Sequence, residues 1–309
     1  MRIYTHAACL AHDTGPGHAE RPERLSAVTE ALQQHFDDLD WHEAPRATRG
    51  QLLRAHHESL LASVLETRPT ERIMLDPDTV LSPASAEAAL RAAGAAIAAT
   101  DAVLGGEVKR AFCAVRPPGH HATIEIAMGF CLFNSIAVAA AHALDKYSLE
   151  RIAIIDFDVH HGNGTQAIFA ADPRVLYVSS HQMPLYPGTG AVDERGVGNV
   201  VNAPLPPGAG SRQFQQAWAD TLLPALDVFR PQLLLISAGF DAHWRDPLAQ
   251  LQLATEDYTW ITRELVAIAD RHAQGRIVSM LEGGYDLDAL GECSVAHISA
   301  LRTTGTSFL

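Results

Sequence analysis

Short apolar runs alternate with longer segments of helical periodicity along most of the chain. The clearest run is 151–155, whose β-branched residues show no polar alternation. This pattern is typical of a strand that is covered on both faces. Comparable runs predict further strands at 3–4, 111–115, 175–179, 233–237 and Ile277–Leu281.

The segments between these runs carry apolar residues at helical spacing. One begins at Pro22, and proline is favoured in the first turn of a helix. The alanine-rich segment Ser85–Leu104 follows a Ser-Pro pair with helix-start chemistry, which predicts a helix packed closely against a sheet. Further helices are predicted over 51–66, 133–146, 211–229 and 256–271.

The alternation of strands and helices predicts an α/β fold, with a central, mostly parallel sheet and helices on both faces. No flexible linker, charge block or internal repeat divides residues 1–309, so we expect a single domain. Because the carboxyl ends of parallel strands meet at one edge of the sheet, the loops that follow the strands should gather there.

Polar residues begin abruptly where the run 151–155 ends. Asp156, Asp158 and His160 alternate with apolar residues, so an extended backbone would put all three side chains on one side. A surface turn can have the same composition, but the preceding strand is too apolar to lie on the surface. Burying two unpaired carboxylates is costly, and a bound cation would offset that cost.

Chemistry-bearing residues also follow the other predicted strands. Each of them alone is an ordinary loop residue, but together they predict one site built from five loops. Its members are His120 and His121, Asp158 and His160, His181, Asp241, and Tyr285.

A metal bound by Asp158, His160 and Asp241 would have three protein ligands and an open position for water and substrate, as catalytic zinc sites do. Two carboxylates and one imidazole favour Zn²⁺ and leave Fe²⁺, Co²⁺ and Mn²⁺ open. Such a metal polarises a carbonyl and lowers the pKa of bound water, which predicts attack of water on a carbonyl group.

That reaction also needs groups that move protons and stabilise the oxyanion. His120 and His121 can accept and donate protons, because imidazole titrates near neutral pH. Tyr285 follows the flexible pair Gly283-Gly284 and can donate its hydroxyl to the developing oxyanion.

Composition narrows the class of protein. The formal net charge of −13 argues against a nucleic-acid-binding surface, and 47% apolar residues are ample for a large core. The four cysteines form no CxxC pair, which argues against a disulfide framework and a thiolate zinc site. Without a signal-like start or an apolar run of transmembrane length, the sequence predicts a cytoplasmic protein that does not bind membranes.

Six motifs spread over most of the chain resemble the histone deacetylase superfamily, and most closely its class II branch with bacterial members. They are RPPGHHA at 116–122, GFCLFNSIAVAA at 129–140, DFDVHHGNGTQ at 156–166, YPGTG at 186–190, SAGFDAHWRDPL at 237–248 and EGGYD at 282–286. The resemblance implies an arginase-like α/β fold and zinc-dependent hydrolysis of an N-acyl amide, usually N-acetyl-lysine.

The resemblance also assigns roles to the residues of these motifs. Asp158, His160 and Asp241 become the zinc ligands, and Tyr285 becomes the oxyanion donor. His121 becomes the general base and acid of the tandem pair. The remaining two positions orient this pair: Asp156 faces His120, and Asn163 faces His121, where class I members carry an aspartate.

Further assignments concern the substrate and a second cation. Phe130 and Tyr186 would form the walls of a narrow tunnel, with Gly129 at its floor. Asp76 resembles the rim aspartate that holds the substrate backbone, with Asp78 as the alternative. The remaining assignments are Arg24 in an internal channel behind the metal, and a structural potassium ion bound by Asp156, Asp158, His160 and Ser179.

The substrate is less tightly specified. Leu248 stands where a polyamine-specific relative has glutamate, which favours an acylated lysine peptide or small neutral acylamide over an acetylpolyamine. An arginase-like binuclear manganese ureohydrolase would need further carboxylates after His160, and a non-catalytic acyl-ligand binder should have lost a catalytic group. Homo-oligomerisation stays open.

Overall fold

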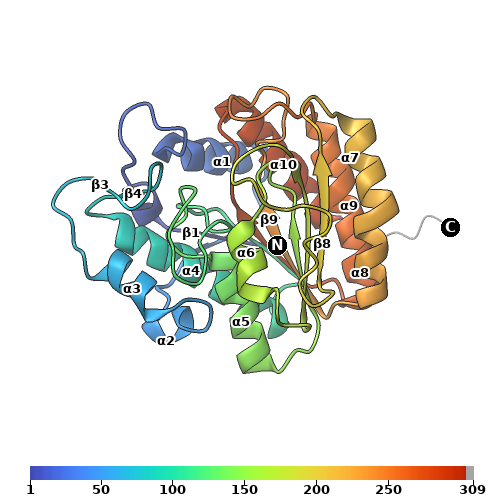
Figure 1. The fold of residues 1–309 in the computed structure, drawn as a ribbon, viewed down its shortest axis with the longest axis horizontal. Coiled ribbons are helices and arrows are strands. Elements are labelled where there is room, and N and C mark those ends of the chain that lie inside the picture. Colours follow the sequence, from blue (N-terminus) through green and yellow to red (C-terminus); the bar gives the residue numbers. More distant parts are fainter. Residues whose placement is uncertain (304–309) are drawn as a thin grey trace.

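The computed structural model describes residues 1–303, and its central feature is a parallel sheet (Figure 1). Eight strands within that range form it, and every neighbouring pair is parallel. In spatial order they are β2 (Asp40–Glu43), β1 (Arg2–Thr5), β5 (Arg110–Cys113), β10 (Ile277–Leu281), β9 (Leu233–Ala238), β6 (Ile152–Asp156), β7 (Val175–Gln182) and β8 (Val200–Leu205). A short antiparallel pair, β3 (Ile73–Met74) and β4 (Val80–Leu81), lies apart from it.

Helices cover both faces of this sheet (Figure 1). On one side lie α4 (Ser85–Leu104), α5 (Ser135–Tyr147) and α6 (Asn163–Phe169). On the other lie α1 (Pro22–His35), α7 (Ser211–Ala217), α8 (Leu223–Phe229), α9 (Thr255–His272) and α10 (Leu287–Arg302). The predicted α/β class is therefore confirmed. Within residues 1–303, no helix combines the length and apolar character needed to cross a membrane.

The alanine-rich helix α4 packs as its composition predicts. Most of its alanines are buried, and its small side chains let α5 and strand β5 approach closely. A Cβ at Gly94 would lie 1.8 Å from the carbonyl oxygen of Pro45, so only glycine lets that loop cross the helix. The close packing of this face follows directly from residue size.

The predicted helix over 51–66 is wrong as a single element. The structure has α2 (Arg49–Leu52) and α3 (Glu58–Leu65), separated by a turn. Thr48 caps the first by accepting the N–H of Gln51, and His57 caps the second by accepting the N–H of Ser59. Each helix thus has an N-terminal cap of its own, and the cap of the second interrupts the helical periodicity that the sequence suggests over 51–66.

The helical segment predicted over 211–229 is continuous but not uniform. A π-helical stretch, Trp218–Leu222, joins α7 to α8. Trp218 is fully buried there, and its indole N–H donates to Ser180 Oγ on β7 at 3.0 Å. The π-helical turn, which is wider than an α-helical turn, therefore begins at Trp218, whose side chain is hydrogen-bonded to the sheet.

The strand order decides where chemistry can be placed. Strands β5, β10, β9, β6 and β7 are consecutive neighbours in the sheet. Their carboxyl ends therefore lie side by side, although the strands come from distant parts of the chain. The loops that leave these ends carry most of the residues that the sequence marks as functional.

Candidate active site

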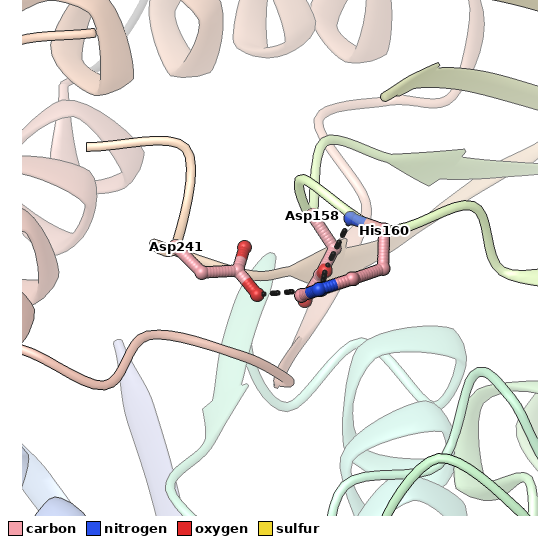
Figure 2. A group of neighbouring side chains, drawn as sticks. All are labelled: Asp158, His160 and Asp241. Atoms are coloured by element: carbon pink, nitrogen blue, oxygen red, sulfur yellow. Dashed lines mark hydrogen bonds and ion pairs between the residues drawn. The ribbon is translucent and has the colours of Figure 1, made fainter. Parts of the chain in front are cut away.

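Three ligand-type side chains meet at the carboxyl ends of β6 and β9 (Figure 2). Nδ1 of His160 lies 3.1 Å from Oδ1 of Asp158 and 3.1 Å from Oδ2 of Asp241. All three residues are buried, and their ligand atoms lie within 4.8 Å of one another. We call this group the triad.

The triad fits a small divalent cation. Ligands about 2.0–2.1 Å from a tetrahedral Zn²⁺ lie about 3.3 Å apart, close to the two observed separations. One imidazole N–H cannot satisfy two buried carboxylates fully, whereas a shared cation can. Three protein ligands would leave a fourth position for another molecule.

Backbone groups hold the carboxylates of the triad in place. Asp158 Oδ2 accepts the N–H of Gly283 at 2.8 Å, and Asp241 Oδ1 accepts the N–H of Val159 at 2.8 Å. A Cβ at Gly239 would lie 2.0 Å from Asp158 Oδ2, and one at Gly283 would lie 2.1 Å from Asp241 Oδ2. The two glycines therefore let the strand ends close around the carboxylates.

The tandem histidines lie beside the triad with different partners. His120 Nδ1 lies 3.0 Å from Asp156 Oδ2, so an N–H at this nitrogen donates to a carboxylate. Burial opposes a positive charge on His120, but the charges of Asp156 and Asp158 raise its pKa to about 10. His120 is therefore the member of the pair that favours the charged form.

His121 faces a neutral group instead. Its Nδ1 lies 2.8 Å from Asn163 Oδ1, while the amide nitrogen of Asn163 points to the sulfur of Met128. The Nδ1 proton therefore donates to Asn163, which leaves Nε2 with a free lone pair. Burial, together with the charges of His120 and His160, lowers the pKa of His121 well below its ordinary value.

Tyr285 completes the arrangement from the loop after β10. Its side chain is buried, and burial raises the pKa of its hydroxyl well above the ordinary value. The guanidinium carbon of Arg24 lies 4.9 Å from the centre of its ring, and the ring of Phe130 packs edge-on at 5.9 Å. A protonated hydroxyl is thus available as a hydrogen-bond donor near the triad.

Comparison with known proteins shows to which family the chain belongs. Residues 18–301 match the model of the histone deacetylase domain. The chain belongs to the histone deacetylase family. It is 40% identical over 308 residues to a probable deacetylase of Archaeoglobus fulgidus, which covers 97% of this chain and 85% of that protein.

Two further comparisons agree on the family. A histone deacetylase-like amidohydrolase of Pseudomonas aeruginosa is 40% identical over 317 residues, covering 95% of this chain and 83% of that protein. The crystal structure of the HDA15 HD domain matches with a TM-score of 0.92 at 34% identity, covering 97% of this chain and 90% of the other. The predicted arginase/deacetylase-like fold is confirmed, and family membership agrees with a deacetylase or amidohydrolase activity.

Tyr186 and Phe130, the expected walls of a deacetylase tunnel, both pack against histidines or Tyr285 at the site. The ring of Tyr186 lies 5.2 Å from that of His121 and 6.4 Å from that of His160, with 38% of Tyr186 exposed. Phe130 has a φ of 68°, an unusual value for a bulky residue, and its N–H donates to Thr79 Oγ1 at 3.0 Å. Such strain is found where a side chain must be aimed at a site.

Gly129, which the resemblance assigns to a tunnel floor, lies against His121. It has a φ of 57°, and a Cβ there would come within 2.5 Å of His121 Cδ2. Any other residue would displace the imidazole ring. The glycine at this position therefore leaves the room that the ring of His121 occupies.

The two rim candidates of the deacetylase fold have different surroundings. Asp76 Oδ1 accepts the N–H groups of Asp78 and Thr79, at 2.9 and 2.7 Å, so its carboxylate holds the turn together. Asp78 is half-buried, and burial together with the charge of Asp76 raises its pKa. After burial, Asp78 is the main charge that raises the pKa of Tyr186. Of the two acids, Asp78 therefore has the larger effect on the pKa of Tyr186.

Arg24, which the resemblance assigns to an internal channel, packs against the loop of Tyr285. It is fully buried and donates to the carbonyl oxygens of Gly284 at 2.6 Å and Glu282 at 2.5 Å. Its carboxylate partner, Glu20, is shared with Arg116. Burial disfavours the charged carboxyl, but the charge of Arg116 lowers the pKa of Glu20 to about 2.

His181 does not join the site as expected. It lies inside β7, with one ring nitrogen 2.8 Å from Ser179 Oγ and the other 3.0 Å from the carbonyl oxygen of Gly190. Ser179 itself is paired in register with Asp156 across β6 and β7. Leu248 is half-buried, and its N–H donates to Asp246 Oδ1 at 2.9 Å.

Two buried acids near the site were not singled out from the sequence. Glu282 Oε2 accepts the N–H groups of Gly119 and His120, at 2.6 and 3.2 Å, and burial raises its pKa to about 7. Asp246 Oδ2 accepts the N–H of Tyr285 at 2.7 Å. Both acids lie inside the motifs shared with the family. These partners are backbone N–H groups far away in the sequence, so no local sequence pattern reveals this role.

Proposed function

We propose that this protein is a zinc-dependent amidohydrolase that removes acetyl or other short acyl groups from N-acyl-lysine or a related linear acylamide. The observation that carries the proposal is the convergence of the triad, the tandem histidines and Tyr285 at the carboxyl ends of neighbouring strands. Ligands, a proton acceptor and an oxyanion donor are the parts that amide hydrolysis requires.

A metal held by Asp158, His160 and Asp241 would supply Lewis-acid polarisation of the substrate carbonyl and activation of water. His121 accepts the proton of the attacking water, because its Nδ1 proton is engaged by Asn163 and its Nε2 is free. It later returns a proton to the leaving amine. His120, held by Asp156, stays protonated and contributes positive charge.

Tyr285 donates its hydroxyl to the oxygen that becomes negative during attack. Burial keeps this hydroxyl protonated at neutral pH, so it can act as a donor. Because the loop that carries it is also hydrogen-bonded to Asp158, donor and metal ligand are held in one unit. Preorganised donors of this kind lower the barrier because they need no reorientation during the reaction.

The residues assigned to the walls and rim of a tunnel support the proposed substrate class. Phe130 and Tyr186 offer aromatic faces to an uncharged aliphatic stem. Asp78 can accept backbone N–H groups of a bound peptide at the entrance, and the net charge of −13 favours cationic partners. Leu248 adds no negative charge, which favours acyl-lysine over an acetylpolyamine.

A structural potassium ion is part of the proposal. Asp156 and Ser179 are paired in register at the ends of β6 and β7, and backbone carbonyls of the adjoining loop, with Asp158 and His160, would complete the ligand set. Oxygen-rich surroundings of this kind suit a hard cation. Such an ion would stiffen the loop that carries two metal ligands.

The test compares turnover of an acetyl-lysine peptide and an acetylpolyamine by the zinc-loaded protein and by Leu248→Glu. We expect the wild type to favour the peptide and the variant to shift the ratio of kcat/KM values toward the polyamine. A wild-type preference for the polyamine would contradict the substrate class. If the metal-replete wild type hydrolyses neither substrate, the proposed reaction itself is contradicted.

A further inference from the structure

Asp246 is a buried acid on the loop that follows β9, five residues after the triad residue Asp241. It is 7% exposed, and each carboxylate oxygen accepts one backbone N–H: Oδ2 that of Tyr285 at 2.7 Å, and Oδ1 that of Leu248 at 2.9 Å. Burial, together with the charge of Asp241, raises the pKa of Asp246 to about 7. The two N–H groups offset part of the cost of burying this carboxyl group.

The segment that Asp246 holds has little rigidity of its own. Tyr285 follows Gly283 and Gly284, and Gly284 has a φ of 118°, a conformation that side chains rarely allow. Arg24 donates hydrogen bonds to the carbonyl oxygens of Glu282 and Gly284. The N–H of Tyr285 itself donates to Asp246.

We propose that Asp246 is a positioning residue for Tyr285. By accepting the N–H of Tyr285, it sets the backbone from which the hydroxyl is aimed at the reacting carbonyl. The inference rests on the proposed function, because Tyr285 has this task only in a hydrolase. It also ties the loop of the metal ligand Asp241 to the loop of the oxyanion donor, so that ligand and donor keep one geometry.

A matched pair of variants separates positioning from general stability. Asp246→Asn keeps the shape but replaces one acceptor oxygen by an N–H₂ group, which faces one of the two N–H donors. Asp286→Asn is the control. Asp286 follows Tyr285 directly in the sequence, and it caps α10 by accepting the N–H of Ala289 at 2.8 Å. We expect kcat of Asp246→Asn to fall roughly 10- to 100-fold, with KM changed less than about twofold.

A double variant tests whether the effect passes through Tyr285. In a Tyr285→Phe background, Asp246→Asn should lower the remaining rate less than about threefold, because the group that it positions is already gone. Bound zinc and the unfolding midpoint are measured for every variant. An additive loss, a loss of zinc, or a phenotype equal to that of Asp286→Asn would each overturn the proposal.

Hydrogen exchange gives a readout that does not depend on turnover. The backbone around 282–286 should exchange faster in Asp246→Asn than in Asp286→Asn and wild type. If the wild type hydrolyses neither substrate, the proposed function fails. Equal exchange of 282–286 in Asp246→Asn and Asp286→Asn would overturn the positioning role, whatever the turnover. If Asp246→Asn does not fold, Asp246→Glu replaces it, since its carboxylate can still accept an N–H while its longer side chain shifts the position of that bond.

Discussion

Asn163 Oδ1 lies 2.8 Å from Nδ1 of His121, at a distance where a carboxylate would stabilise a positive charge on the imidazole. An amide oxygen accepts the same proton without that charge. The neighbouring histidine, His120, has a carboxylate partner in Asp156. Besides burial and the charges of His120 and His160, the lack of a carboxylate partner thus helps to keep His121 neutral and able to accept a proton.

Replacing Asn163 by aspartate should therefore make His121 more basic. We expect the acidic limb of the kcat/KM profile to move to higher pH by about 1–2 units, because an opposite charge within hydrogen-bonding distance raises an imidazole pKa. Below this limb His121 is protonated and cannot accept a proton, so the variant is slower near neutral pH. The profile measured with an acetyl-lysine peptide checks this, and an unmoved limb would refute the assignment of His121 as the base.

The triad should couple metal binding to stability. We expect Zn²⁺ to bind the folded triad and to raise the free energy of unfolding by about 2.7 kcal/mol at a concentration 100 times its Kd. Unfolding midpoints with chelator and with added Zn²⁺ measure this effect. Asp241→Ala should abolish the zinc-dependent increase, whereas Asp270→Ala, on the surface of α9, should retain it. An equal response in both variants would mean that zinc binds elsewhere.

The two rim acids should have separable effects. Asp78→Asn should raise KM for a peptide roughly 5- to 20-fold with little change in kcat, the loss expected for a hydrogen bond to a charged acceptor. Asp76→Asn should mainly lower the free energy of unfolding, by about 1–2 kcal/mol, because Asp76 holds its own turn. Michaelis constants and urea unfolding of both variants test this, and the reverse pattern would return the rim role to Asp76.

Buried histidines that stay neutral in the folded protein should make the free energy of unfolding decrease as the pH falls. Burial lowers the pKa of His297 from 6.5 to about 3, and its ring nitrogens lie 2.7 Å from Thr262 Oγ1 and 2.9 Å from Ser279 Oγ. The unfolded chain gains a proton below pH 6.5 while the folded protein does not until about pH 3. The contribution to stability is therefore complete above pH 6.5 and is lost as the pH falls toward 3.

A histidine replacement measures that contribution. In metal-free protein, His297→Gln should reduce the slope of unfolding free energy against pH by up to about 1.4 kcal/mol per unit between about pH 6 and 4. His42→Gln, at an exposed position of β2, is the control and should leave most of the slope unchanged. Equal slopes for wild type and His297→Gln would show that the residue is protonated in the folded state.

The central strands could be predicted from the sequence because they are apolar without interruption. The prediction for 151–155 is one residue from β6, and that for Ile277–Leu281 coincides with β10. The edge strands were missed for the opposite reason. β2 reads DWHE, and β8 contains the polar Asn202 and also Pro204, a residue that sheets accept mainly at edge positions.

The site shows the same division. Asp158, His160 and Asp241 were found because polar ligands directly follow buried strands, and the structure brings them together. His181 has the same local signature, yet it lies inside β7 and binds Ser179 and Gly190. Only tertiary structure distinguishes a ligand that leaves the strand from a histidine that stays in it.

Asn199 illustrates a contact that no local pattern encodes. Its amide nitrogen lies 2.8, 2.9 and 2.8 Å from the carbonyl oxygens of Phe169, Asp172 and Val175. It thereby joins the end of α6 and the start of β7 to the segment that enters β8. Three acceptors from one loop converge on a residue more than twenty positions away, which depends on the assembled sheet.

The measurement that tests the central claim most directly is turnover of an acetyl-lysine peptide by zinc-loaded wild type, Tyr285→Phe and His121→Ala. We predict hydrolysis by the wild type and a loss of at least about 100-fold in kcat for each variant, with zinc content unchanged, because an oxyanion donor or a general base is removed. Wild-type rates in either variant, or no hydrolysis by metal-replete wild type, would contradict the account.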